Sequence, residues 1–258
     1  MKKLAGFALL IAILFATAPF AQAVYTYGTN VQGTSVIYET ITADDPEPGS
    51  TLPLWGTMSI SGNALRFKPT DFEAEAQDGA SDTVDGTLQF TLKSKPGQAE
   101  NRYITSINFI EYGHYSLLDN TLTGFDGTNA TNAAVTCGLF IDIEEIDGQF
   151  YFGPTIEASL TYTPSSGDYF LDADGETLLL SSWQGGLNLD LADYGFTNVT
   201  KLSVSINNIL NVASEDGTYA LIEKKGVGEN PAIEIVPVIP EPATMVLLGL
   251  GGLLLRRK

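Results

Sequence analysis

The sequence predicts an all-β protein, an antiparallel β-sandwich of jelly-roll type with ten or more strands in a single domain. Apolar and polar residues alternate along many segments, so that each strand has one buried and one wet face. Asp-Gly pairs, which favour tight hairpin turns, occur six times. Helical periodicity is nearly absent, and no repeat of fixed period indicates a solenoid or propeller.

The strand predictions follow the alternation along the chain. It is clearest where one face collects only apolar residues: Leu88, Phe90 and Leu92; Ile156, Ala158, Leu160 and Tyr162; Leu202, Val204 and Ile206. Further strands are expected at residues 35–42, 52–61, 64–68, 103–110, 112–118, 177–183 and 219–224. The Asp-Gly pairs lie at 78–79, 85–86, 126–127, 147–148, 174–175 and 216–217. Short helical turns are expected only at 72–77 and 189–193.

Residues 1–23 have the three parts of a secretory signal peptide. Lys2 and Lys3 precede an apolar stretch, and Ala21-Gln22-Ala23 supplies the small-x-small pattern that signal peptidase accepts. We therefore expect cleavage after Ala23, with residues 24–235 forming the β-sandwich domain.

The C-terminal tail, residues 236–258, has a different composition. Pro240-Glu241-Pro242 is followed by an uncharged apolar stretch at 243–255 and then by three basic residues. As a helix this stretch rises about 20 Å, which is short of the hydrocarbon core of a bilayer. The basic end favours a cytoplasmic terminus. These features predict a short transmembrane helix suited to transient insertion.

The order of Pro-Glu-Pro, short apolar helix and basic end resembles the PEP-CTERM sorting domain. The resemblance covers less than a tenth of the chain. It implies recognition by an exosortase at or near Pro240, Glu241 and Pro242, after export by the general secretion machinery. It also implies a bacterial protein of the cell envelope, surface or extracellular matrix, in organisms that build extracellular polysaccharide or biofilm.

The charge of the domain limits its partners. Outside the terminal signals the chain holds 8 basic and 30 acidic residues. Such a surface repels phosphates, which excludes nucleic-acid binding. Cys137 is the single cysteine, so no intrachain disulfide forms. Its place in an alternating run puts it on an inward face, where a thiol behaves as a small apolar side chain.

The residues with chemical potential do not form a recognisable active site. His114 is the single histidine, with Ser116 and Asp119 nearby, but no nucleophile-elbow motif is present. Glu111, Glu144 and Glu157 are arbitrary choices among many carboxylates for a glycosidase pair. We expect no catalytic site and no cofactor.

Two kinds of ligand remain open at this point. Asp172, Asp174 and Glu176 surround a glycine turn and offer oxygen ligands for calcium. An ordinary Asp-Gly turn is the favoured explanation of these residues, so we predict no metal site. Aromatic residues beside polar groups would suit carbohydrate, yet core packing is the commoner use of such rings. The candidates are Trp55, Trp183, Tyr112, Tyr115 and Tyr169.

The sequence thus predicts a non-catalytic, exported surface or matrix protein. A carbohydrate-binding sandwich associated with exopolysaccharide is the alternative, and a glycoside hydrolase is a third reading.

Overall fold

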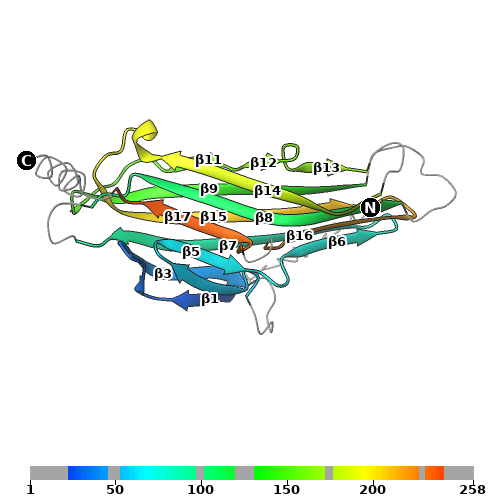
Figure 1. The fold of residues 1–258 in the computed structure, drawn as a ribbon, viewed down its shortest axis with the longest axis horizontal. Coiled ribbons are helices and arrows are strands. Elements are labelled where there is room, and N and C mark those ends of the chain that lie inside the picture. The colour runs from blue at the N-terminus through cyan, green and yellow to red at the C-terminus, as the bar shows by residue number, and fades with distance from the viewer. Residues whose placement is uncertain are drawn as a thin grey trace, which may run out of the picture.

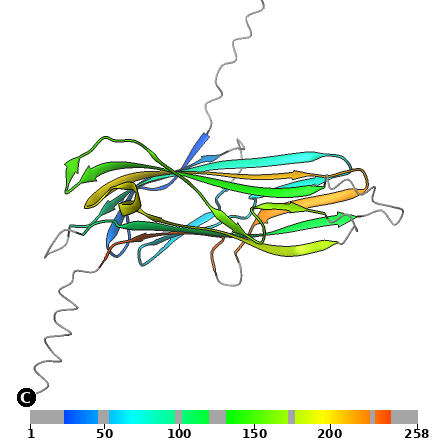
Figure 2. The same ribbon diagram turned by 90° about the horizontal axis from the view of Figure 1, so that it is seen from above.

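A computed structural model describes residues 23–45, 53–96, 102–119, 131–171, 177–226 and 230–240. Their regular structure consists of antiparallel strands and one short 3₁₀ helix. Two long sheets face each other along the molecule (Figures 1 and 2). This confirms the predicted all-β, sandwich-like fold. The signal peptide up to Gln22, the tail from Glu241 onward and the Asp-Gly pairs at 126–127 and 174–175 lie outside the described residues.

The larger sheet has nine strands. Its main path runs β1 (Ala23–Gly28), β3 (Val36–Asp45), β7 (Ser81–Ser94), β15 (Val199–Ala213), β9 (Asn132–Ile146) and β10 (Gln149–Phe150). β2 (Val31–Gln32) pairs with β3, and both β11 (Ile156–Ser159) and β13 (Asp168–Phe170) pair with β9.

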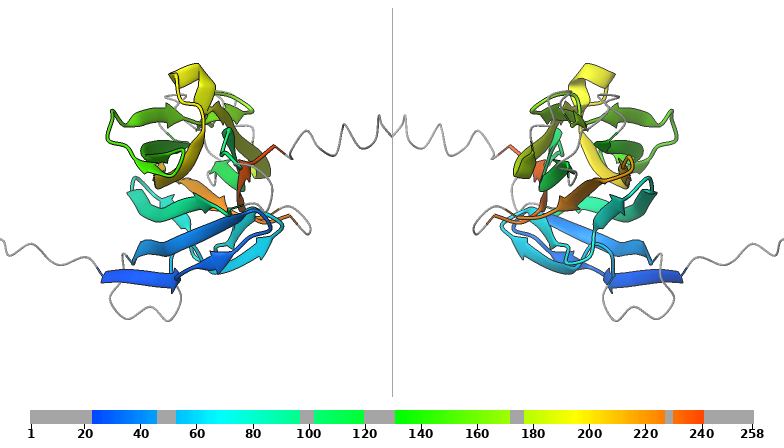
Figure 3. Two further views of the ribbon diagram at one scale, coloured as in Figure 1. Left: turned by 90° about the vertical axis from the view of Figure 1, so that its left-hand side faces the viewer. Right: turned by 90° about the vertical axis from the view of Figure 1, so that its right-hand side faces the viewer.

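The second sheet has eight strands. Its path runs β12 (Thr161–Thr163), β14 (Leu178–Asp190), β8 (Ser106–Asp119), β17 (Ile233–Val238), β5 (Ala64–Lys68) and β4 (Thr57–Ser61). β16 (Thr218–Lys224) pairs with β8 and with β6 (Glu73–Gln77). The short 3₁₀ helix η1 (Leu191–Tyr194) lies on the opposite side of the sandwich from β1 (Figure 3).

The long strands alternate between the two sheets along the chain. β7, β9 and β15 belong to the nine-stranded sheet, whereas β8, β14 and β16 belong to the eight-stranded sheet. Each strand sends every second side chain into the space between the sheets. The two inner faces form a single core. In β15, alternate residues are buried from Leu202 to Val212.

Several local predictions are confirmed. The 64–68 strand is β5, and η1 forms at the predicted helical turn near residue 191. Asp78 and Gly79 both have positive φ, at 53° and 82°, in the turn between β6 and β7. Asp147 and Gly148 repeat this geometry between β9 and β10, with φ of 51° and 72°. Two consecutive positive φ angles are typical of a type I′ turn. The second turn closes the β9–β10 hairpin, whereas the first connects strands of different sheets.

Other local predictions are wrong. Residues 72–77 form strand β6 and its entry rather than a helical turn, because Phe72, Ala74 and Ala76 all pack into the core. Asp85-Gly86 is not a turn but lies inside β7. The two strands expected at 103–110 and 112–118 are one continuous strand, β8. The run at 156–162 divides between the sheets as β11 and β12.

None of the helical segments in the described ranges is long and apolar enough to cross a membrane.

The structure makes a specific prediction for Cys137. Its side chain is 3% exposed, and burial together with the nearby Glu111 charge raises the pKa of the thiol. Because the thiolate is the reactive form, folded protein should resist iodoacetamide at about pH 8, whereas unfolded protein should be labelled fully. Mass spectrometry of the labelled chain measures this. A Thr136→Cys variant, with its thiol at an exposed neighbouring position, is the matched control. Rapid labelling of Cys137 in folded protein would contradict the burial.

Candidate functional site

The C-terminal sorting segment starts directly after a strand of the core. β17 lies between β8 and β5, and its last residue, Val238, accepts a hydrogen bond from the backbone N–H of Thr105 at 2.9 Å. Pro240 follows two residues later and is exposed. Glu241 and Pro242 lie beyond the described residues. The predicted signal-peptidase residue Ala23 is the first residue of β1, and Ala21 is outside the described residues.

A polar centre lies buried between the two sheets, made of Glu111, Lys224, Asn208 and Tyr162. One carboxylate oxygen of Glu111, Oε2, accepts hydrogen bonds from Lys224 Nζ at 2.7 Å and from Asn208 Nδ2 at 2.8 Å. The other, Oε1, accepts one from the Tyr162 hydroxyl at 2.9 Å. The Glu111 and Lys224 side chains have no solvent exposure. We call these four residues the buried polar centre.

Each member of the buried polar centre comes from a different strand. Glu111 lies on β8, Lys224 on β16 and Tyr162 on β12, all in the eight-stranded sheet, whereas Asn208 lies on β15 of the facing sheet. The centre therefore connects the two layers. Isolated buried charges are costly, so three donors around one carboxylate are needed to offset its loss of hydration.

Aromatic rings enclose the lysine. Lys224 Nζ lies 5.0 Å from the centroid of the Trp183 ring and 5.3 Å from that of Phe72. Both distances are within the range of cation–π attraction. Burial, and then the charge of Glu111, raises the pKa of Tyr162, so that its hydroxyl remains protonated and donates to the carboxylate.

Three strand glycines make room for this arrangement. Gly185 pairs with Glu111, Gly113 with Lys224, and Gly86 with Asn208, each in a neighbouring strand. A Cβ atom on Gly113 would lie 2.3 Å from the Trp183 ring, and one on Gly185 would lie 2.6 Å from the Tyr162 ring. Glycine inside a strand often marks such a close approach.

Sequence reasoning treated Glu111 as an arbitrary carboxylate and missed Asn208 and Lys224. A signal for all three was present, because each occupies an inward-facing position in an otherwise apolar alternation. On β15, for example, Asn208 follows Leu202, Val204 and Ile206 on the buried face.

The residues considered for a triad have other partners. Nδ1 of His114 lies 3.8 Å from Oε1 of Glu223 on the adjacent strand β16. Ser116 is buried, and its hydroxyl accepts a hydrogen bond from the backbone N–H of Leu180 at 3.0 Å. Asp119 ends the same strand, β8. His114 and Ser116 are therefore engaged in contacts between strands rather than with each other.

The three glutamates considered for a glycosidase pair occupy separate environments. Glu111 is in the closed interior. Glu144 forms an ion pair with Lys201 at 3.1 Å, and Glu157 is exposed on β11. Lys201 also contacts Glu39 at 3.0 Å. The hydrogen bond to Glu39 is the main reason that the pKa of Lys201 is raised.

The aromatic residues considered for carbohydrate mostly pack in the core. Trp55 and Trp183 are fully enclosed, and Tyr115 stacks on Tyr169 with ring centroids 4.1 Å apart. Tyr112 is half-buried. The four buried rings are therefore used for core packing and are not exposed to a carbohydrate ligand.

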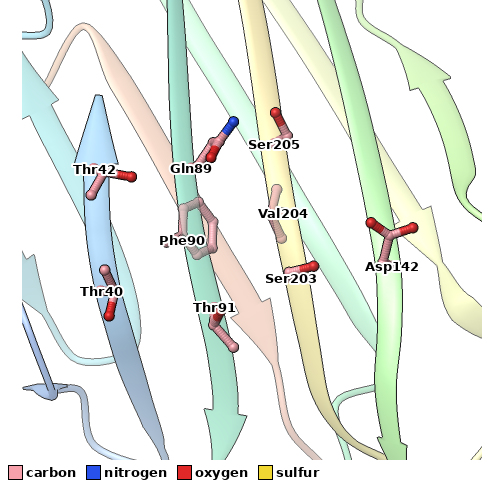
Figure 4. A pocket seen from close by; sticks show the side chains of 9 residues that line it. All are labelled: Thr40, Thr42, Gln89, Phe90, Thr91, Asp142, Ser203, Val204 and Ser205. Atoms are coloured by element: carbon pink, nitrogen blue, oxygen red, sulfur yellow. The ribbon is translucent and has the colours of Figure 1, made fainter. Parts of the chain in front are cut away.

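A polar groove of about 350 Å³ crosses the outer face of the nine-stranded sheet (Figure 4). Strands β3, β7, β15 and β9 contribute its outward side chains, and Phe90 and Val204 lie beneath them. We call this feature the outer groove. Its outward residues are Thr40, Thr42, Gln89, Thr91, Asp142, Ser203 and Ser205.

A bulge in β3 shapes one wall of the outer groove. The pairing of β3 with β7 shifts register between Glu39 and Thr42, and Thr40 adopts a φ of 44°. A positive φ is unusual for a β-branched residue, and bulges commonly redirect a side chain. On the other side, Phe140 is 39% exposed and pairs directly with Ser205. The groove thus combines hydroxyl, amide and carboxylate groups with a flanking aromatic ring.

The calcium candidate formed by Asp172, Asp174 and Glu176 lies outside the described residues. Within the described ranges, no group of three or more His, Cys, Asp or Glu side chains is arranged to hold a metal ion.

Comparison with protein families identifies one match. Residues 238–258 match the PEP-CTERM protein-sorting motif, which confirms the resemblance found in the sequence. The motif implies an exported protein of the cell envelope or surface that is processed by an exosortase. No curated protein sequence matches the chain.

Similarity to solved structures is weak. Endoglucanase 3 of family GH12 from Trichoderma harzianum aligns with 86% of this chain and 100% of its own, at 9% identity and a TM-score of 0.22. The VP2 subviral particle of infectious bursal disease virus aligns with 82% of this chain and 58% of its own, at 11% identity and a TM-score of 0.14. TM-scores this low do not indicate a shared fold.

The buried polar centre predicts a strong dependence of stability on its charge balance. Lys224→Met removes the cation and leaves the Glu111 carboxylate buried without its charged partner, which should lower the free energy of unfolding by about 3–5 kcal/mol. In Glu111→Gln/Lys224→Met both charges are absent, so this double variant should be more stable than Lys224→Met alone. Denaturant unfolding followed by tryptophan fluorescence measures both. Lys225→Met, at an exposed neighbour, is the control. Equal free energies of unfolding for the single and double variants would contradict the conclusion that the unpaired Glu111 carboxylate destabilises Lys224→Met.

Proposed function

We propose that this chain is a non-catalytic structural or interaction protein, delivered to the bacterial cell surface or extracellular matrix. The observation that carries the proposal is the PEP-CTERM motif at residues 238–258, which overlaps the end of core strand β17. Pro240 is exposed immediately after that strand, where a processing enzyme has access to the chain.

The position of the charged residues supports a non-catalytic role. Glu111 and Lys224 of the buried polar centre are the two charged residues that are buried in the described part of the chain. Their carboxylate and ammonium groups have no contact with solvent. A substrate from outside cannot reach Glu111 without separating the sheets. The centre therefore serves the protein's own structure rather than turnover of an external substrate.

Replacing Pro240, Glu241 and Pro242 by alanine tests the delivery route. An extended Pro-Glu-Pro segment is the expected recognition element, so the variant should accumulate as an unprocessed precursor in the membrane fraction of the native host. Immunoblots of cell fractions measure the accumulation of the precursor. Mass spectrometry of the C-terminal peptide of the released protein identifies the position of cleavage. Pro154→Ala, at an exposed loop position, is the control. Unchanged processing and release of the triple variant would refute exosortase sorting of this chain.

The outer groove supports a second candidate function, binding of a hydroxyl-rich extracellular polysaccharide. Threonine and serine hydroxyls, the Gln89 amide and the Asp142 carboxylate line one continuous surface. Such groups donate and accept the hydrogen bonds that sugar hydroxyls need. The strongly acidic composition disfavours anionic polymers, so a neutral polysaccharide fits best.

Substitutions in the outer groove test this second function. Gln89→Ala and Asp142→Ala should each weaken binding to a neutral polysaccharide by about tenfold, because each removes hydrogen bonds made in the groove. Retention on a polysaccharide array, followed by titration calorimetry on the glycan retained, measures the affinity. Thr136→Ala, an exposed position on β9 outside the groove, should bind as the unsubstituted protein does. If the unsubstituted protein is retained on no glycan, the polysaccharide function is wrong, and the sorting function is unaffected.

A further inference from the structure

The buried polar centre holds the three groups needed for an amide cross-link between side chains. A primary amine, a carboxamide and a carboxyl group meet at a single atom, Oε2 of Glu111. We propose that Lys224 and Asn208 become joined by an intramolecular isopeptide bond, with Glu111 acting as the general acid and base.

Lys224 is positioned as the nucleophile. Its side chain has no solvent exposure and lies between the rings of Trp183 and Phe72. The neutral amine is the nucleophilic form of a lysine side chain, so attack requires the loss of one Lys224 proton. Glu111 Oε2 accepts a hydrogen bond of 2.7 Å from Lys224 Nζ and is therefore placed to accept the proton. Transfer along this hydrogen bond converts the ammonium and carboxylate into an amine and a carboxylic acid.

Asn208 is positioned as the electrophile. It is completely buried, and its Nδ2 donates to the same Glu111 oxygen that accepts from Lys224. Its Oδ1 atom has no hydrogen-bond partner within the described part of the chain. The two ends of an amide are nearly alike in shape. A half-turn of the side chain therefore brings Oδ1 to the protonated Glu111, which then donates to it and polarises the carbonyl.

The reaction is balanced without any co-reactant. The lone pair of Lys224 Nζ attacks Asn208 Cγ, and a new C–N bond forms while Glu111 gives its proton to Oδ1. Glu111 then takes a proton from the attacking nitrogen and passes it to Nδ2. The bond from Cγ to Nδ2 breaks, Nδ2 leaves as ammonia, and the carbonyl re-forms as the Oδ1 proton returns to Glu111. Glu111 ends as the carboxylic acid, with the one proton that it first took from the Lys224 ammonium group. Fixed neighbours supply the proximity that favours attack.

The geometry favours Asn208 over Glu111 as the acyl partner of the lysine. Both Glu111 oxygens already accept hydrogen bonds, from Tyr162 on one side and from Lys224 and Asn208 on the other. A bond to Asn208 also joins β16 of one sheet to β15 of the other. It would connect the two layers covalently in a chain whose single cysteine allows no internal disulfide.

Mass spectrometry of the full-length protein tests the cross-link. The measured mass of the folded chain should be lower than the mass calculated from its sequence by one ammonia molecule. Protease digestion should yield one branched peptide that contains both Lys224 and Asn208. A folded protein of full mass, whose digest gives the two segments as separate unmodified peptides, would overturn the proposal. Loss of a water molecule that persists in Asn208→Ala would also overturn it, because the lysine would then be bonded to Glu111.

Variants identify the role of each group. Glu111→Gln and Lys224→Met should both show the full sequence mass, the first because no proton carrier remains. Asn208→Asp, if linked, should lose water instead of ammonia. Asn207→Asp and Lys225→Met alter adjacent residues and should retain the branched peptide. A branched peptide that forms normally in Glu111→Gln would overturn the acid–base role. Because the unsubstituted chain decides whether the bond exists, failure of one variant to fold leaves that test intact.

Discussion

Glu111 accepts three hydrogen bonds inside a closed apolar core, and much of the architecture around it follows from that requirement. The carboxylate sits on β8, while its donors come from β12, β15 and β16. A one-residue slip of any of these strands would turn its donor to the opposite face. The buried charge therefore selects one register for four strands, beyond what apolar packing specifies. The three glycines opposite the centre and the rings of Trp183 and Tyr162 complete the same arrangement.

The sequence was sufficient for the fold class because alternation is a local property. Strand β5 and the turns at Asp78-Gly79 and Asp147-Gly148 depend on neighbouring residues and were predicted correctly. Asp85-Gly86 has the same turn chemistry, yet there the chain continues as β7, with Gly86 packed beneath Leu54 and Trp55. The packing of Gly86 in the core and the long ladder of backbone hydrogen bonds between β7 and β15 outweigh the preference of Asp-Gly for a turn. The alanine and glutamate residues of β6 likewise favour helix, but Phe72, Ala74 and Ala76 fit one buried face.

The candidate sites were less accessible to sequence reasoning. The predicted strands end at residue 110 and resume at 112, which leaves out Glu111, whereas β8 passes through this residue unbroken. What makes a buried glutamate tolerable is Lys224, more than a hundred residues away, and no local pattern shows that the two meet. The outer groove is similar, since Gln89, Ser205 and Asp142 become neighbours only when β7, β15 and β9 pair. By contrast, the sorting motif is defined by consecutive residues, so the sequence alone was sufficient to identify it.

The placement of β17 has a mechanical consequence for a protein held by its C-terminal tail. This strand pairs with β8 along its whole length and with β5 at Ile233–Ile235. While the tail is held, a pull along the strand axis loads the backbone hydrogen bonds of β17 together in shear instead of opening them one after another. Tension during that time enters the eight-stranded sheet through an interior strand, before an edge strand can peel away.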